Sequence, residues 1–411
     1  MSSSVWRSSI AFVGRADVTD AALASPTAID WTESLERDFR RRFIEAIKAL
    51  DIRSLERYPP PKTNGLPFGH EMRILRRFVR GGSSMLDQSA LSGAYRALAS
   101  PRQRLTYRAL VIGESLPTQA WHGLIGSAAV SDWMAAHVLE ATPGGRIRAR
   151  FRTIAASNLI LIVDPLDETF RFRVHIGQDS LNMAEFLTRR DFPRDIRTLD
   201  VGTGSGILLM TVARGAREGV GVDINPRAVR IASFNAELNE LSNCRIELRD
   251  IFAHGGDLGR FECITWNTPF MFFPESWREK SVDGYGGHLG IEIPLKFVDQ
   301  LPSLLSDRGT AFLLAAGPRM LDGSNRLDFE LDRRARAHRL DVVAHVLQTF
   351  WFPSLREFYA QHRVQNFESV MLEISRGHGR VIRRDRSLAI TAVDAVRDLI
   401  YRVRGQGLPS R

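Results

Sequence analysis

The stretch LDVGTGSG, residues 199–206, decides the fold of this chain. Apolar residues lead into it from Ile196 as a short strand, and Ile207–Ala213 follows with the pattern of a helix. Glycines let the backbone turn sharply between strand and helix and let a ligand approach the main chain closely. Asp200 is therefore expected at the carboxyl end of the first strand, where open α/β sheets bind ligands.

Apolar, β-rich runs alternate with helical stretches from about residue 196 onward. The clearest helices between them are expected at Ala228–Leu241 and Pro294–Leu305. Strands separated by helices predict an α/β fold with a mostly parallel, doubly wound sheet. The predicted strands are IRTLDV (196–201), EGVGVDI (218–224), CRIELRD (244–250), FECITWN (261–267), GTAFLLAA (309–316), DVVAHVLQ (341–348) and ESVMLEIS (368–375).

Two further acids follow later strands. Asp223 ends the second strand about 20 residues after the turn, a position that suits a carboxylate accepting hydrogen bonds from two ribose hydroxyls. Asp250, after the third strand, could accept from an adenine amino group. A glycine-rich turn alone also occurs in dinucleotide enzymes, but here Ile207 stands where their fingerprint has a third small residue. The turn also carries its own acid, Asp200.

In combination, DVGTGSG, GVDI and RDIF resemble motifs I, II and III of class I S-adenosylmethionine-dependent methyltransferases. The resemblance covers roughly residues 175–375. It implies a Rossmann-like seven-stranded sheet and S-adenosylmethionine as the cofactor. A dinucleotide enzyme, or a cofactor-fold binding module without catalysis, stays open as an alternative. The implied cofactor-binding residues are Asp200, Gly202, Thr203, Gly204, Gly206, Asp223, Ile224, Asp250, Ile251 and Asn267.

The fourth predicted strand ends in Trp266-Asn267-Thr268-Pro269-Phe270, similar to the Asn-Pro-Pro-Tyr/Phe motif of methyltransferases that modify amide or exocyclic amino nitrogens. Such a nitrogen is a poor nucleophile because its lone pair is delocalised. Two acceptors, the Asn267 side-chain oxygen and the Thr268 carbonyl, would take its two hydrogens and direct the lone pair at the methyl group. Phe270 could stack on the planar acceptor. We predict Asn267, Thr268, Pro269 and Phe270 as catalytic residues. Threonine replaces the usual proline, which suggests a less rigid loop.

Two flanking segments resemble those of release-factor glutamine methyltransferases and related enzymes: VHIGQDSL (174–181) and GYGGHLGIE (284–292). The glycines of the second suggest a mobile substrate loop, in which His288 is a loop residue rather than a base. Asp179 or Ser180 could instead cap the next helix. The candidate substrate contacts are Gln178, Asp179, Phe270 and Tyr285.

The N-terminal part has a different pattern. Residues 31–50 predict an amphipathic helix with Thr32 as its N-cap and Leu35, Phe39, Phe43, Ile44, Ile47 and Leu50 on one stripe. Short helices followed by strands from a Gly144-Gly145 turn suggest a winged-helix-like module. We predict a flexible tail at 1–30, a helical or winged-helix-like module at 31–145, a hairpin-rich connector at 146–178, the methyltransferase domain at 179–376 and a basic C-terminal extension at 377–411.

The formal net charge is +9, carried mostly by arginine. Arg146, Arg148, Arg150 and Arg152 recur at the period of a strand and share one face. Two interpretations stay open: the outer face of a half-buried strand, or a basic wing that grips phosphate or acidic side chains. Likewise, the charge either favours anionic partners or reflects a genome that encodes Arg for Lys.

Composition narrows the setting. No apolar run reaches the ~18 residues of a membrane span, and no secretory signal is expected at the N-terminus. Two unpaired cysteines, Cys244 and Cys263, predict a cytoplasmic protein without a metal cluster. The methyl acceptor is predicted to be a protein glutamine. An RNA or DNA amino group and a small-molecule nitrogen are the alternatives.

Overall fold

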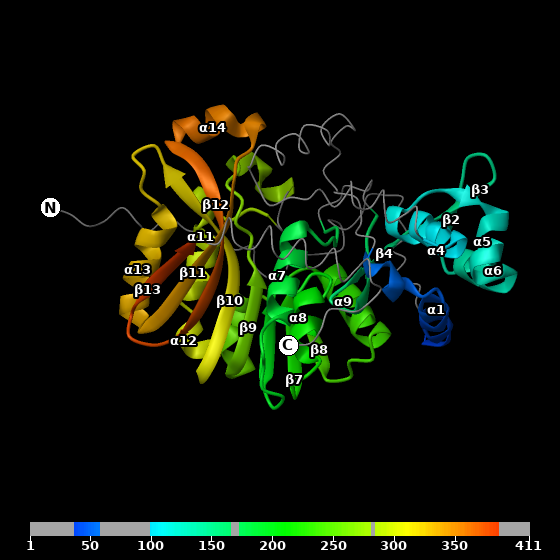
Figure 1. The fold of residues 1–411 in the computed structure, drawn as a ribbon, viewed down its shortest axis with the longest axis horizontal. Helices are drawn as coiled ribbons and strands as arrows, with labels where there is room; N and C mark the ends of the chain where they lie inside the picture. Colours follow the sequence, from blue (N-terminus) through cyan, green and yellow to red (C-terminus); the bar gives the residue numbers. More distant parts are fainter. Residues whose placement is uncertain (1–36, 58–98, 166–171, 281–283, 386–411) are drawn as a thin grey trace.

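The computed structural model describes residues 37–57, 99–165, 172–280 and 284–385. Its centre is an eight-stranded sheet (Figure 1). Its strands pair in parallel except β12, which runs antiparallel to both of its neighbours. In order across the sheet they are β13 (Val381–Asp385), β11 (Leu340–Phe350), β12 (Val364–Arg376), β10 (Leu305–Met320), β9 (Phe261–Asn267), β6 (Arg197–Val201), β7 (Glu218–Asp223) and β8 (Cys244–Leu248).

The sheet confirms the predicted α/β class. Each of the seven predicted runs forms a strand, from β6 to β12. The sheet nevertheless has eight strands rather than seven, because β13 adds in parallel to the edge of β11. Part of the basic segment predicted as a C-terminal extension from residue 377 is therefore built into the sheet. The expected helix near the C-terminus lies outside the described residues.

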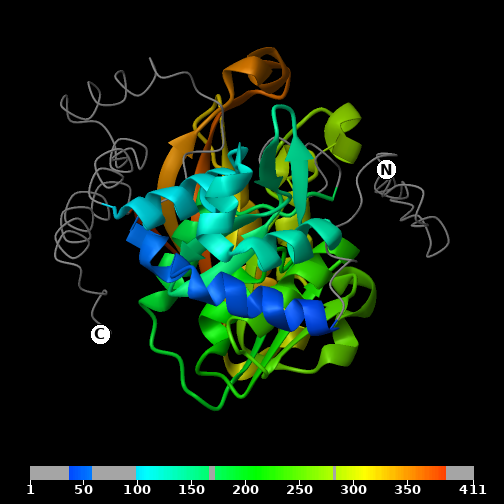
Figure 2. The same ribbon diagram turned by 90° about the vertical axis from the view of Figure 1, so that its right-hand side faces the viewer.

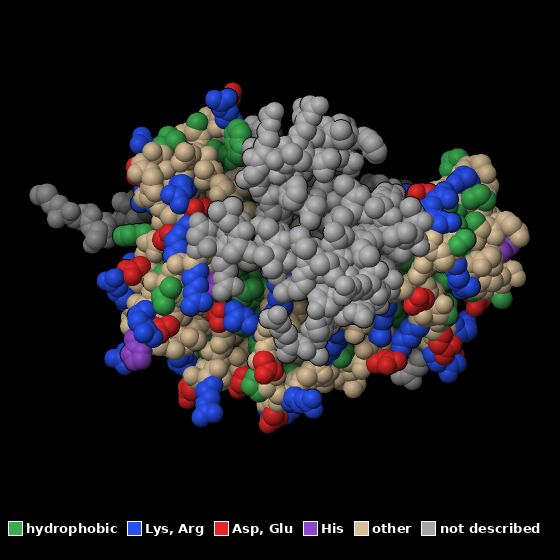
Figure 3. Space-filling view, in the orientation of Figure 1, with side chains coloured by type: hydrophobic (Ala, Val, Ile, Leu, Met, Phe, Trp, Pro, Cys, Tyr) green, Lys and Arg blue, Asp and Glu red, His purple; other side chains and the backbone are tan. Residues whose placement is uncertain are grey.

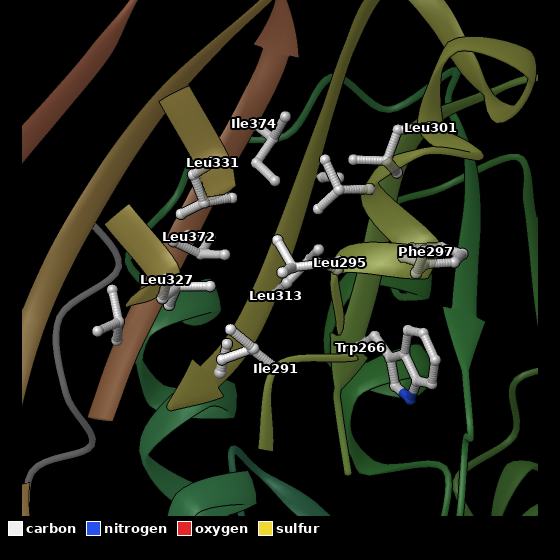
Figure 4. Close-up of a cluster of buried hydrophobic side chains, with 14 of the residues drawn as sticks. Trp266, Ile291, Leu295, Phe297, Leu301, Leu313, Leu327, Leu331, Leu372 and Ile374 are labelled. Atoms are coloured by element: carbon white, nitrogen blue, oxygen red, sulfur yellow. The ribbon is translucent and has the colours of Figure 1, made fainter. Parts of the chain in front are cut away.

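Helices cover both faces of the sheet. Buried side chains of α7 (Gln178–Thr188) and α8 (Ile207–Ala213) pack with Phe312 and Leu314 on one face. On the other face, Leu313 and its neighbours pack against α11 (Glu292–Val298) and α13 (Arg326–His338), as Figure 4 shows. The remaining helices of this half are α9 (Pro226–Leu238), α10 (Ile251–His254), α12 (Leu301–Leu304) and α14 (Arg356–Gln361), with 3-10 turns at Gly255–Leu258, Glu275–Lys280, His288–Gly290 and Pro353–Leu355.

Two predicted helices differ in detail. The expected helix at Ala228–Leu241 is α9, which begins two residues earlier because Asn225 caps it and Pro226 opens it. The expected helix at Pro294–Leu305 divides into α11 and α12. Pro302 lies in the first turn of α12, where its missing N–H costs nothing.

The N-terminal part combines short helices with a small antiparallel sheet of order β1-β3-β2. Figure 2 shows its helices in blue and cyan in front of the central sheet. Its grouping as a separate winged-helix-like domain stays a prediction. Its elements are α1 (Arg37–Ala49), a 3-10 turn (Ile52–Arg57), α4 (Pro101–Thr106), a π-helical turn (Tyr107–Ile112), β1 (Leu116–Pro117), α5 (Thr118–Ile125), α6 (Ser127–Ala135), β2 (Leu139–Thr142) and β3 (Arg146–Ala149).

The predicted apolar stripe of the first helix is buried where the structure describes it. Thr32, Leu35 and the predicted tail at 1–30 lie outside the described residues. The buried stripe residues are Phe39, Phe43, Ile44, Ile47 and Leu50.

The predicted boundary between residues 145 and 146 falls inside the small sheet. The turn at Gly144-Gly145, where both residues have positive φ, joins β2 to β3. The hairpin that follows, β4 (Arg152–Ala156) and β5 (Leu159–Val163), is a separate two-stranded sheet. A boundary at residue 145 would therefore separate two paired strands.

The four regularly spaced arginines bond within the chain. Arg146 donates to the carbonyl of Ser115, and Arg148 and Arg150 pair with Glu140. Arg152 is buried, and its Nε donates to the carbonyl of Val111. On the face shown in Figure 3, Lys and Arg side chains lie among Asp and Glu side chains. These contacts favour the first interpretation, the outer face of a half-buried strand, and not a basic wing that binds phosphate.

The β4–β5 hairpin is fastened to α9 by two carboxamides one helical turn apart. Asn235 accepts from the N–H of Ile162 at 2.8 Å and donates to its carbonyl at 3.0 Å. Asn239 makes the same pair of bonds to Ile160. Asn235 Nδ2 also donates to the carbonyl of Ser205 at 2.9 Å, in the glycine-rich turn. One side chain thus joins the hairpin to that turn.

We expect Asn235→Ala to lower the free energy of unfolding by about 3 kcal/mol, because it leaves buried backbone groups without partners. Asn235 is fully buried, whereas Asn239 is half-exposed, so water can replace the Asn239 side chain. Asn239→Ala is therefore the matched control, with a smaller loss. Urea unfolding of both variants measures the difference, and equal losses would contradict this account.

No helix among the described residues is long and apolar enough to cross a lipid bilayer. Both cysteines are free thiols, and Cys263 is buried in the sheet.

Candidate functional site

Three adjacent parallel strands, β9, β6 and β7, bring the predicted site segments to one edge of the sheet. Asp200 pairs with Thr265 of β9 on one side and with Gly221 of β7 on the other. Because the strands run in the same direction, their carboxyl ends meet at the same edge. The glycine-rich turn, Asp223 and Asn267 therefore lie along that edge.

The turn itself has a conformation that requires glycine. Gly202, Gly204 and Gly206 have φ of 56°, 54° and 83°. A Cβ at Gly202 would also lie 2.9 Å from Nε1 of Trp266. The N–H of Gly204 donates to Oδ2 of Asp223 at 2.9 Å, which ties the turn to the end of β7. The turn is thus bonded to the end of β7 and packs closely against Trp266 of β9.

Asp200 braces the turn from inside the protein. Its carboxylate is buried and accepts from the hydroxyls of Thr203 and Thr265, both at 2.8 Å, and from the N–H of Leu209 at 3.2 Å. Burial raises the pKa of Asp200 from the ordinary 3.8 to about 7. Asp200 and the hydroxyl of Thr203 are therefore buried and hydrogen-bond to other residues of the chain. They stabilise the turn and do not form a surface that a cofactor could contact.

The raised pKa gives a pH-dependent stability. The folded chain keeps a proton on Asp200 that the unfolded chain releases above pH 3.8, so this stabilisation is present in acid and is lost as pH rises to about 7. We expect the free energy of unfolding of the wild type, relative to Asp200→Asn, to fall between these pH values by up to about 1.4 kcal/mol per pH unit. Urea unfolding of both proteins across this range is the test, and parallel curves would contradict it.

The other predicted cofactor residues differ in accessibility. Asp223 stands at the end of β7, where its Oδ1 also accepts from the N–H of Asn225. Next to it, the side chain of Ile224 is 51% exposed. Asp250 caps α10 by accepting from the N–H of Phe252 at 2.8 Å. Ile251 is 4% exposed and belongs to the hydrophobic core, so its side chain is not available to a ligand at the surface.

Asn267 has an unusual hydrogen-bonding pattern. Its Nδ2 donates to Oδ2 of Asp179 at 3.0 Å and to Oγ of Ser180 at 2.8 Å. Its Oδ1 is buried and has no hydrogen-bond partner among the described residues. A buried acceptor without a partner costs about 1–3 kcal/mol, so it calls for an explanation.

Asp179 and Ser180 are therefore partners of Asn267 and not helix caps. The N-cap of α7 is Gly177, and no side chain caps that end. Sequence reasoning had singled out this segment but had not paired it with Asn267, which is 88 residues from Asp179. Gln178, the third candidate of the segment, donates instead to Asn182 at 2.9 Å along α7.

Thr268 is held firmly despite the missing proline. Its hydroxyl donates to the carbonyl of Leu314 on β10 at 2.7 Å, and its N–H bonds the same oxygen at 3.3 Å. Its side chain is buried. The hydroxyl thus supplies a hydrogen bond that proline could not make, and the expected lower rigidity of the loop stays a prediction.

The glycine-rich segment 284–292 packs directly on the loop after Asn267. The N–H of Met271 donates to Gly284, and that of Gly286 donates to Met271. A Cβ at Gly290, whose φ is 73°, would lie 2.3 Å from the carbonyl oxygen of Phe270. These glycines permit close packing of the segment on the loop after Asn267, and the mobility expected of it stays a prediction. His288 is exposed and begins the 3-10 turn His288–Gly290.

The remaining predicted residues lie around this loop. Phe270 is half-buried, as is Pro269, and its ring centroid lies 6.3 Å from that of Phe350. The hydroxyl of Tyr285 donates to Glu275, and burial raises the pKa of Tyr285 to about 12. Among the described residues, no group of three or more His, Cys, Asp or Glu side chains could hold a metal ion.

The part of the chain that contains this site is similar to known proteins. Residues 193–306 match the family model described as "Methyltransferase domain". The matched residues include the glycine-rich turn, Asp223, Asp250, Asn267 and the glycine segment 284–292 that packs on the loop after Asn267.

Two curated relatives extend the comparison. A Methanocaldococcus jannaschii protein named as an N5-glutamine methyltransferase is 37% identical over 123 residues, which cover 28% of this chain and 59% of the relative. The release factor glutamine methyltransferase of Rhodospirillum rubrum is 29% identical over 243 residues, which cover 49% of this chain and 73% of the relative.

A solved structure, a ribosomal protein L11 methylase from Lactobacillus delbrueckii subsp. bulgaricus, is also similar. It is 19% identical with a TM-score of 0.32, and the match covers 50% of this chain and 81% of that one.

Proposed function

We propose that the chain is an S-adenosylmethionine-dependent N-methyltransferase whose acceptor is the carboxamide nitrogen of a protein glutamine. The proposal depends on one observation: the buried Oδ1 of Asn267 has no hydrogen-bond partner among the described residues, although Nδ2 of the same carboxamide has two. An unpaired, fixed acceptor at the ligand-binding edge of the sheet suits an incoming N–H group.

The residues present fit the proposed cofactor. The glycine-rich turn exposes main chain to close approach, Asp223 offers a carboxylate at the end of β7, and the exposed Ile224 offers an apolar surface beside it. S-adenosylmethionine, when bound, would supply an electrophilic methyl group. Asp200 and Thr203 would hold the turn without touching it.

The acceptor would lie beside Asn267. A carboxamide nitrogen carries two hydrogens, one for Oδ1 of Asn267 and one for the carbonyl of Thr268. With both bonded, the lone pair is directed out of the amide plane, and the positive charge that develops on the nitrogen is stabilised by two oxygens. Phe270 would pack against the flat amide group.

Protein glutamine is favoured over nucleic acid for two reasons. Both relatives described above are named for glutamine methylation. In addition, the four regularly spaced arginines, which could have bound phosphate, make hydrogen bonds and ion pairs to other residues of this chain. The two free thiols agree with our proposal of a cytoplasmic protein.

The test is a partition of methyl label. The purified chain is incubated with methyl-labelled S-adenosylmethionine and, separately, with a bacterial release factor, total tRNA, DNA and a small-metabolite extract. We expect label in the release factor, and N5-methylglutamine in its digest by mass spectrometry. Label confined to nucleic acid or metabolites would overturn the glutamine assignment, and S-adenosylmethionine that fails to bind would overturn the whole proposal.

A further inference from the structure

The first turn of α7 contacts the side chain of Asn267 through two different acceptors, a carboxylate and a hydroxyl. We propose that Asp179 and Ser180 are positioning residues that fix which end of the Asn267 carboxamide faces the acceptor, and so make the site select a primary carboxamide over an isosteric carboxylate. This inference rests on the proposed function.

Asp179 sets the direction of the carboxamide. An ionised carboxylate can only accept hydrogen bonds, so it must face Nδ2 of Asn267. If the Asn267 carboxamide were rotated by half a turn, its Oδ1 would face the carboxylate oxygen of Asp179, and the two oxygens would repel each other. Ser180 could accept or donate, and therefore adds a second anchor without choosing the direction. Together they leave Oδ1 as the carboxamide atom without a hydrogen-bond partner among the described residues.

The charge of Asp179 is supported by its place on the helix. It lies in the first turn of α7, where the helix dipole favours a negative charge. The preceding Gly177 leaves space for it, because a Cβ there would lie 2.2 Å from Oδ1 of Asp179. A side chain at position 177 would therefore displace the Asp179 carboxylate from the place it has here.

The helix that carries these residues is itself held in place. Met183 and Leu187 are buried against the sheet. Just beyond its C-terminal end, Arg190 makes two hydrogen bonds to Glu373 on β12 and stacks over the ring of Phe186. α7 is therefore anchored at a distance from Asn267, which keeps the two acceptors in fixed positions.

Selectivity follows from this arrangement. A primary carboxamide presents two N–H donors to two oxygens, Oδ1 of Asn267 and the carbonyl of Thr268. A carboxylate of the same shape would place oxygen against oxygen, and its charge would be repelled by Asp179 nearby. A site built to bond an N–H group rejects an analogue that lacks it strongly.

The kinetic test uses variants of the full chain and the release factor as acceptor. We expect Asp179→Ala to lower kcat by about tenfold or more, Asp179→Ala with Ser180→Ala to lower it further, and the Kd for S-adenosylmethionine to stay within about twofold. Asp179→Asn can accept from Nδ2 but can also donate to Oδ1 of a rotated Asn267 carboxamide, so it should recover only part of the loss. Glu185→Gln, which removes an exposed pairing with Arg189 on the same helix, is the control.

The outcomes differ in meaning. Unchanged kcat in both alanine variants would overturn the positioning role while leaving the proposed function in place. Full activity of Asp179→Asn would also overturn it, because that side chain can donate as well as accept and so does not set the direction of the Asn267 carboxamide.

A second measurement needs no methyl transfer. With 15N-asparagine labelling, the side-chain amide signal absent from Asn267→Ala identifies Asn267. Propionamide should shift this signal at lower concentration than propionate does, and Asp179→Ala should remove that preference. If no acceptor is methylated, the proposed function fails, yet this preference still decides the positioning role. Equal binding of the two probes by the wild type would overturn it.

Discussion

Asn267→Ala is expected to lower methyl transfer by about 100-fold to 1,000-fold, the range for losing one preorganised acceptor or donor at the reacting group. The variant deletes Oδ1, the unpaired oxygen assigned to the acceptor nitrogen. The cofactor should still bind, because the turn is held by Asp200, Thr203 and Asp223, none of which hydrogen-bonds to Asn267. Initial rates and calorimetric titration with S-adenosylmethionine measure the two effects separately.

The matched control is Asn182→Ala. Asn182 is exposed on α7 and accepts from Gln178, so the same substitution there removes a surface contact. Full turnover by Asn267→Ala would show that the acceptor binds elsewhere. A parallel loss of transfer and of cofactor binding would instead assign Asn267 to the cofactor.

Gly290→Ala is expected to disrupt both stability and activity. Its φ of 73° is costly for alanine, and the new Cβ would lie 2.3 Å from the carbonyl oxygen of Phe270. Because backbone cannot move aside cheaply, the loop that begins at Asn267 must shift. We expect a loss of about 3 kcal/mol in the free energy of unfolding, together with most of the transfer activity. Thermal or urea unfolding and initial rates are the measurements.

Gly323→Ala separates the two causes. Gly323 has a similar φ of 82°, but a Cβ there meets no atom within 4 Å. This variant should lose about 1 kcal/mol through backbone strain and keep its activity. If both variants behaved alike, close packing on the loop at Phe270 would not be the reason for glycine at position 290.

The fold was largely predictable because strong local patterns specify it. The glycine-rich turn marked the end of the first strand and the start of α8. The bounds of α8 match the predicted helix at Ile207–Ala213. The runs in the middle of the sheet could be recognised as strands because burial on both faces leaves few polar residues in them, whereas the edge strand β8 has no buried residue and alternates apolar with charged residues. β13 escaped prediction because its basic sequence has no apolar pattern, and only its pairing with β11 makes it a strand.

The site was less predictable than the fold. The sequence could suggest Asn267 by resemblance, but its partners Asp179 and Ser180 come from a distant helix, and only the packed chain brings them together. Asp200 was interpreted as a cofactor contact because local sequence does not reveal its burial or its bonds to Thr203 and Thr265. Long-range hydrogen bonds thus account for both differences.

Asn235 has a practical consequence for anyone who shortens this protein. A fragment that starts at residue 179, the predicted domain boundary, would lack the β4–β5 hairpin. An apolar side of α9 would then be exposed to water. On that side Ile231, Phe234 and Leu238 pack in the same core as Ile160 and Ile162. The carboxamide would keep its bond to Ser205 but lose both bonds to Ile162. A fragment that keeps these contacts to the glycine-rich turn must therefore begin upstream of residue 152, so that it includes β4 and β5.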